Sequence, residues 1–96
     1  MTQYLLLIQG NLTSDSTPHE WEAFFTAAQE SGLFKGGSEI GTRHVVGNTQ
    51  SAKSTAHIVG FMRFDAEDKQ KILDLLQRHP VVLHGGSVEL CEMPKS

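Results

Sequence analysis

The distribution of hydrophobic and polar positions along this chain predicts four strands. Residues 4–8 form a continuous apolar run of strand length. Such a run is typical of a strand that is covered on both faces. A second strong strand pattern lies at residues 57–64, and weaker ones lie at residues 39–46 and 87–93. The two strong runs are therefore predicted to form the centre of a sheet.

A helix is predicted to begin at Pro18 and to end at Gly32. Thr17 is a suitable N-cap, Pro18 fits the first helical position, and Glu20 completes a capping box with Thr17. Gly32 is suited to a left-handed cap at the C-terminal end. Apolar side chains recur at i, i+3, i+4 and i+7 and predict one buried stripe, formed by Trp21, Phe24, Phe25 and Ala28.

A second helix is predicted between Asp65, which we expect to cap it, and Pro80, which we expect to end it. Glycine and polar residues predict a turn at residues 36–37 and a flexible hairpin tip at residues 47–56. Residues 81–86 are expected to form an irregular connector. The buried stripe of this second helix is predicted to consist of Ile72, Leu73, Leu75 and Leu76.

The resulting order, β-α-β-β-α-β, is that of the ferredoxin-like α+β fold. We expect one domain over residues 1–96, with two helices on one face of a four-stranded antiparallel sheet. The central strands also carry apolar side chains on the face that the helices leave open, namely Leu5, Leu7, Val59 and Phe61. An uncovered apolar face of this size is unusual on a monomer. The pattern therefore predicts a homodimer packed sheet against sheet.

Composition narrows the possible partners. Of the 96 residues, 39% are hydrophobic and the net charge is -3, which is typical of a globular domain. Without a run of Lys or Arg, the chain lacks the basic stripe that a sequence-independent nucleic-acid binder needs. No apolar stretch is long enough to cross a membrane, and residues 4–8 are too short for a signal-peptide core. With Cys91 as the single cysteine, we expect a reduced, cytoplasmic protein.

Several short motifs occur in order along the chain: residues 4–10, Trp21, Gly32, residues 36–37 and the closing segment 79–90. In this order they resemble the YCII-related and DGPF-domain family over nearly the whole chain. The resemblance implies a dimeric α/β barrel built of ferredoxin-like subunits. It also implies lyase-like or hydrolase-like chemistry with a His–Asp pair in some members, and a regulatory role in others. The literal Asp-Gly-Pro-Phe signature is absent.

Candidate site residues cluster around the first helix. His19 is the candidate proton carrier, with Glu20 and Glu39 as carboxylate partners, because His titrates near neutrality and a carboxylate fixes its tautomer. The alternative is that His19 is simply exposed in the first helical turn. Trp21 is a candidate pocket wall or core residue. Arg43 is a candidate for binding an acidic group, or else a surface residue. The resemblance places the family's helix histidine at Trp21 and makes Glu39 a candidate acidic partner.

Other reactive side chains predict no further site. The five histidines lack the close spacing of metal ligands, so neither a metal nor a cofactor is expected. They are His19, His44, His57, His79 and His84. Cys91 has no cationic neighbour in sequence, Arg63 is expected at the surface or dimer rim, and the paired glycines are expected in turns.

Two hypotheses follow. In the first, the protein binds a small acidic or aromatic metabolite in a pocket between sheet and helices, bounded by Trp21, Glu39 and Arg43. It would be a binding protein or an enzyme of lyase or hydrolase type. In the second, it is a non-catalytic regulatory or interaction module that acts as a dimer.

Overall fold

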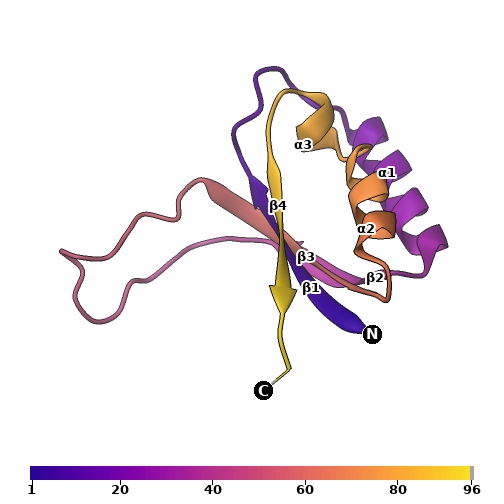
Figure 1. Cartoon of the computed structure of the whole chain (residues 1–96). Coiled ribbons are helices and arrows are strands. Elements are labelled where there is room, and N and C mark those ends of the chain that lie inside the picture. Colours follow the sequence, from indigo (N-terminus) through magenta and orange to yellow (C-terminus); the bar gives the residue numbers. More distant parts are fainter. Residues whose placement is uncertain (96) are drawn as a thin grey trace.

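The computed structural model describes residues 1–95 and has the predicted α+β architecture (Figure 1). Four antiparallel strands form one sheet in the order β2-β3-β1-β4, with all helices on one side of it. The strands are β1 (Thr2–Gln9), β2 (Phe34–Glu39), β3 (Ile58–Ala66) and β4 (Val88–Met93). The helices are α1 (Pro18–Ser31), α2 (Lys69–Leu76) and the short α3 (Pro80–Leu83). The ferredoxin-like strand order and the central place of β1 and β3 are confirmed.

The core lies between the sheet and the helices. On β1 the buried side chains are Tyr4, Leu6 and Ile8, and on β3 they include Met62 and Phe64. From the helical layer the core receives Phe24, Ala28, Ile72, Leu75, Leu76 and Val81. Alternation along β1 and β3 thus sends every second residue into this layer.

Helix α1 begins and ends as its sequence predicts. Thr17 Oγ1 accepts a hydrogen bond from the Glu20 backbone N–H at 3.2 Å, and Glu20 Oε1 accepts one from the Thr17 backbone N–H at 2.9 Å. These two bonds form a complete capping box. At the other end, Gly32 adopts the left-handed conformation with φ 73°, which is costly for residues with a Cβ.

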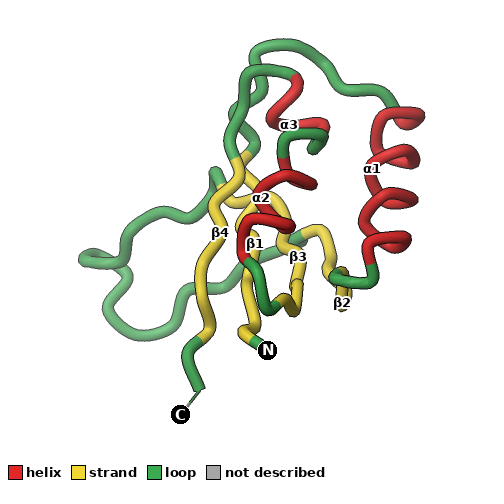
Figure 2. The backbone as a smooth tube through the Cα atoms, turned by 45° about the vertical axis from the view of Figure 1, so that its right-hand side comes forward, coloured by secondary structure: helices red, strands yellow, loops and turns green. Residues whose placement is uncertain are grey.

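The predicted strand at residues 39–46 is wrong. The strand β2 spans Phe34–Glu39 instead, and it includes the two glycines that were expected to form a turn. A register shift between Phe34 and Gly36 marks a bulge, in which Gly36 has φ 125°. Pairing ends soon after Glu39 because β3 starts only at Ile58. Residues 40–57 form a long exposed loop that projects away from the sheet (Figure 2).

The second helical region also differs from the prediction. Asp65 does not cap a helix, because it continues β3 opposite Gln3. Asp68 is the N-cap of α2, and its Oδ1 accepts a hydrogen bond from the Gln70 backbone N–H at 2.9 Å. Pro80 does not end that helix either. It stands at the first position of α3, where its missing N–H is not needed.

The face of the sheet opposite the helices is uncovered (Figure 1). Leu5, Leu7 and Phe61 are half-buried there, and Val59 is 41% exposed. Cys91 pairs with Leu5 across the sheet, so it lies on the same face as a free, half-buried thiol. The apolar character of both faces of β1 and β3, predicted from sequence, is therefore present in the structure.

Candidate functional site

A cavity of about 560 Å³ lies between α1 and the β2–β3 edge of the sheet. Its walls are mainly apolar. Trp21 and Phe25 line it from α1, and Phe34 and Met62 line it from the sheet. The other lining residues are Ile8, Leu12, Ser16, Gly37, Ser38, Glu39, Ile40, Val59, Gly60, Phe61 and Val81. Such a concave, mostly apolar site with a few polar groups is typical of small-molecule sites.

Trp21 is held in one orientation at the cavity wall. Its indole Nε1 donates a hydrogen bond to Ser16 Oγ at 3.0 Å, and its ring stacks on Phe25 with 5.9 Å between centroids. The ring of His79 meets it edge-on at 5.0 Å. Trp21 is half-buried, so part of its surface is available to a ligand. The prediction left pocket wall and core open, and Trp21 serves as both.

The cavity's polar groups are few. They are Glu39 at the end of β2, Ser16, whose hydroxyl accepts the Trp21 N–H, and Ser38, whose hydroxyl donates to the Glu39 carbonyl oxygen. None of the residues that line this cavity is a Lys or Arg. A ligand that offers N–H or O–H donors therefore suits these acceptors better than an anion does.

The structure does not join His19 to its predicted partners. His19 is exposed in the first turn of α1, and no hydrogen bond or ion pair of its side chain occurs within residues 1–95. Glu39 lines the cavity, whereas His19 does not. Glu20 bonds to a different histidine, His84.

Arg43 lies outside the cavity. It is in the long loop 40–57, where its guanidinium donates hydrogen bonds to the carbonyl oxygens of Thr55 and Ile58. These bonds close the base of the loop. Arg63 is exposed on β3, in agreement with its predicted surface position.

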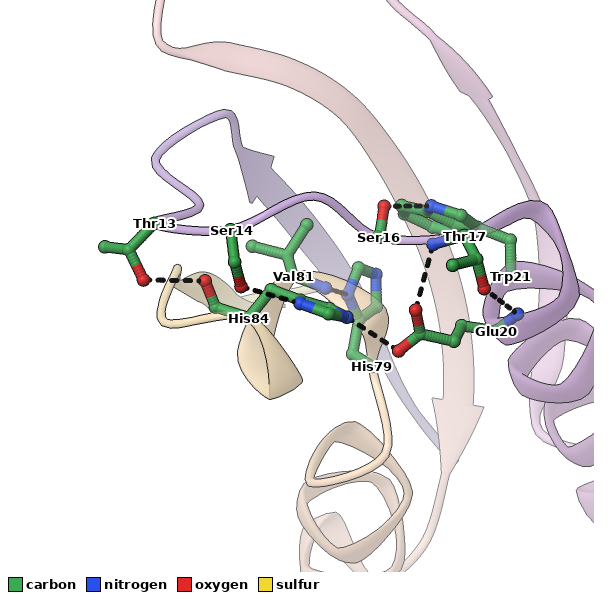
Figure 3. A network of polar contacts seen from close by, with 9 residues as sticks. All are labelled: Thr13, Ser14, Ser16, Thr17, Glu20, Trp21, His79, Val81 and His84. Carbon is green, nitrogen blue, oxygen red and sulfur yellow. Dashed lines mark hydrogen bonds and ion pairs between the residues drawn. The ribbon is translucent and has the colours of Figure 1, made fainter.

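A chain of polar contacts connects the loop before α1, the first turn of α1 and the end of α3 (Figure 3). Ser14 Oγ lies 2.8 Å from His84 Nδ1, and His84 Nε2 lies 2.7 Å from Glu20 Oε2. The His84 and Glu20 side chains are 20% and 28% exposed. Glu20 thus caps α1 with one carboxylate oxygen and binds His84 with the other. The hydrogen bond from His84 is the main reason that the pKa of Glu20 lies below its usual value, and the Thr17 backbone N–H adds to it.

His79 is a second histidine of this region, and it is fully buried. Its Nδ1 accepts a hydrogen bond from the Val81 backbone N–H at 3.1 Å, which caps α3. Nε2 has no hydrogen-bond partner within residues 1–95, and the edge-on rings of Trp21 and Phe24 flank the imidazole at 5.0 Å and 4.6 Å. Burial lowers the pKa of His79 to about 4, because an imidazolium would lose its hydration here.

Sequence reasoning missed the Ser14–His84–Glu20 chain. Glu20 and His84 are 64 residues apart, and no local motif links them. One signal was present in the glycines after His84. Gly85 has φ 80°, and a Cβ there would collide with Thr13, so this glycine lets the His84 turn approach the loop before α1 closely.

Within residues 1–95, no group of three or more His, Cys, Asp or Glu side chains could hold a metal ion. No helix in the same range is long and apolar enough to span a bilayer.

Comparisons with known proteins give similarity among solved structures. No protein-family model matches the chain, and no curated protein matches it. Among solved structures, the crystal structure of At3g17210 from Arabidopsis thaliana is similar, with a TM-score of 0.45 and 12% sequence identity. The alignment covers 100% of this chain and 96% of that one.

Proposed function

We propose that this protein binds a small, largely aromatic molecule in the cavity beside Trp21. The cavity itself carries the proposal: it holds about 560 Å³ within apolar walls, and Trp21 is fixed at its edge. Aromatic side chains favour aromatic ligands through offset or edge-on ring contacts. The cavity volume lies within the range of common small-molecule sites, which is large enough for a ligand of one or two rings.

The polar lining refines the ligand class. The sequence suggested an acidic or aromatic metabolite, and the acidic alternative depended on Arg43. Since Arg43 bonds to the base of its own loop, the aromatic alternative is the better supported one. Glu39 favours a ligand that carries a hydroxyl or an amine, because an ionised carboxylate only accepts hydrogen bonds.

The proposal includes acid–base chemistry of lyase or hydrolase type. His84 and Glu20 support it, because they form an imidazole–carboxylate pair of the kind expected at His19, although neither residue lines the cavity. Membership of the YCII-related family and a cytoplasmic location also belong to the proposal. The motifs around Trp21 and Gly32 support the first, and the free thiol of Cys91 supports the second.

A ligand panel tests the proposed specificity by thermal shift, because a ligand that binds only the native state raises the melting temperature. We expect p-cresol and benzylamine to raise the melting temperature and phenylacetate to leave it unchanged. In Glu39→Gln, benzylamine should no longer raise the melting temperature more than phenylacetate does, because phenylacetate should begin to bind. Glu89→Gln is the matched control, because Glu89 is exposed on β4 away from the cavity. A wild-type protein that responds to none of the three compounds contradicts the proposal.

A second candidate function is that of a dimeric, non-catalytic module. The observation in its favour is the uncovered apolar sheet face, with Leu5, Leu7 and Phe61 half-buried and Val59 exposed. A second copy would cover it with the same surface, as a two-fold axis requires. This assembly does not involve the α1 wall of the cavity, formed by Trp21 and Phe25, whereas Val59 and Phe61 belong to both surfaces.

A further inference from the structure

Three side chains from separate segments form a linear relay at the end of α3. Ser14 comes from the loop before α1, Glu20 from the first turn of α1, and His84 from the residue that follows α3. Figure 3 shows the His84 ring lying between the serine hydroxyl and the carboxylate. None of the three lines the cavity beside Trp21.

The carboxylate sets the direction of the hydrogen bonds. Glu20 is an acceptor when ionised, so the 2.7 Å contact makes His84 Nε2 the donor. In the neutral ring the other nitrogen then has a free lone pair. His84 Nδ1 therefore accepts, and Ser14 Oγ–H donates across 2.8 Å. This is the order of donors in which a carboxylate orients an imidazole and the imidazole activates a hydroxyl.

Backbone contacts hold the serine and the histidine in register. The His84 carbonyl oxygen accepts hydrogen bonds from Thr13 N at 2.8 Å and from Thr13 Oγ1 at 3.1 Å. Thr13 precedes Ser14 directly, so these bonds place the hydroxyl beside the ring. The following residue, Gly85, makes the close approach sterically possible.

Ser14 is accessible to a substrate. It is exposed, and it lines a shallow hollow formed by Gly10 and residues 12–16. Within residues 1–95, the backbone N–H groups of Ser14 and Asp15 donate to no hydrogen bond. They are thus free to stabilise negative charge on an acyl oxygen, as backbone donors near a nucleophile do. Ser16 lines both this hollow and the cavity beside Trp21, so the two adjoin.

We propose that Ser14 is a nucleophile for small esters, with His84 as its general base and Glu20 as the positioning residue. Ser14 Oγ attacks the ester carbonyl carbon while its proton passes to His84 Nδ1. The carbon–oxygen bond to the leaving group breaks, and the departing alcohol takes that proton. Water then attacks the acyl-serine, gives a proton to His84, and releases the acid as Ser14 regains its proton. Ester and water become acid and alcohol, with no redox partner. This inference rests on the acid–base part of the proposed function and not on ligand binding in the cavity.

A fluorophosphonate probe and p-nitrophenyl acetate test the proposal on the full chain. The serine oxygen displaces fluoride from the probe, so we expect the wild-type protein to gain the mass of one probe less HF, and peptide mapping to place the adduct on Ser14. Ser14→Ala should remove the adduct and the hydrolysis. Ser51→Ala should retain both, because Ser51 is an exposed serine of the distant loop 40–57. His84→Gln should slow acylation by about 100-fold or more, which is the usual contribution of a general base.

A purely structural role for the relay predicts different results. In that case His84→Gln lowers the melting temperature, but the wild-type protein carries no adduct on Ser14. The absence of that adduct, or an acylation rate unchanged in His84→Gln, overturns the proposal. Either result leaves the ligand panel for the cavity unaffected, so failure here is distinguishable from failure of the proposed ligand binding.

Discussion

At the scale of single residues, His79 is the most unusual group in the structure. It is fully buried, one nitrogen caps α3, and the other has no hydrogen-bond partner. Because Nδ1 accepts a hydrogen bond, the neutral ring carries its proton on Nε2. The rings of Trp21 and Phe24 surround this histidine and leave little room for water. Burial therefore disfavours the protonated form of His79 in the folded core.

Protonation of His79 links stability to pH. Its pKa falls from 6.5 to about 4 on folding, so between these values the unfolded chain binds a proton that the folded chain excludes. Above pH 6.5 His79 is neutral in both states and does not lower the stability. As the pH falls below 6.5, proton binding by the unfolded chain lowers the free energy of unfolding. We expect the free energy of unfolding in urea to drop by up to about 3 kcal/mol between pH 7 and pH 4.

The variant His79→Asn separates this effect from other titrations. Asparagine retains an acceptor for the Val81 N–H but does not titrate. The free energy of unfolding of this variant should therefore lose most of its dependence on pH between pH 7 and pH 4. His19→Asn, at an exposed position, should preserve it. If His79→Asn retains the full slope, the assignment to His79 is wrong.

At the scale of elements, the sequence predicted those helices and strands whose ends depend on interactions between neighbouring residues. The capping box of Thr17 and Glu20 and the left-handed Gly32 set the ends of α1, and each is visible in a few consecutive residues. β1 was equally clear, because its apolar run had no competing interpretation. These elements needed no knowledge of distant parts of the chain.

Elements that depend on distant partners were misplaced. Two consecutive glycines favour a turn, yet Gly36 and Gly37 lie in β2, because they pair with β3 and the β3 backbone approaches Gly37 closely. The site followed the same rule. Trp21 and Glu39 were predicted to line a pocket and do line the cavity, whereas the contact between Glu20 and His84 arises only when α3 docks beside α1.

The glycine in β2 gives an element-scale prediction. A Cβ on Gly37 would overlap the Phe61 carbonyl oxygen and lie 2.9 Å from Met62 Cα. Gly37→Ala should therefore push β2 from β3 and cost about 1–3 kcal/mol of unfolding free energy, as overpacking does. Gly41→Ala is the matched control, because a Cβ there meets nothing within 4 Å. Equal stabilities of the two variants in urea unfolding would contradict this account of β2.

At the scale of the whole molecule, the two layers leave one sheet face without a covering layer. A chain of 96 residues buries a small fraction of its surface compared with larger domains, so a second copy would add core that a single chain lacks. The long loop 40–57 extends from the sheet on the side away from the helices (Figure 1). Two apolar side chains of this loop, Val45 and Val46, are 61% and 93% exposed.

Sedimentation equilibrium tests the dimer. We expect the wild-type protein to sediment with twice the chain mass of 10.6 kDa. Leu7→Lys places a charge on the open face and should yield monomers, whereas Thr26→Lys, on the exposed side of α1, should remain dimeric. A wild-type protein that sediments at 10.6 kDa at micromolar concentration contradicts the dimer.

The central claim is that an aromatic ligand binds beside Trp21, and intrinsic fluorescence tests it most directly. Trp21 is the only tryptophan and lines the cavity, so its emission reports on this site alone. Titration with p-cresol should change the emission along a saturable, single-site curve. N-acetyltryptophanamide serves as the control for collisional quenching. If the emission of the protein changes linearly with p-cresol concentration, and by the same amount as that of the control, the claim is contradicted.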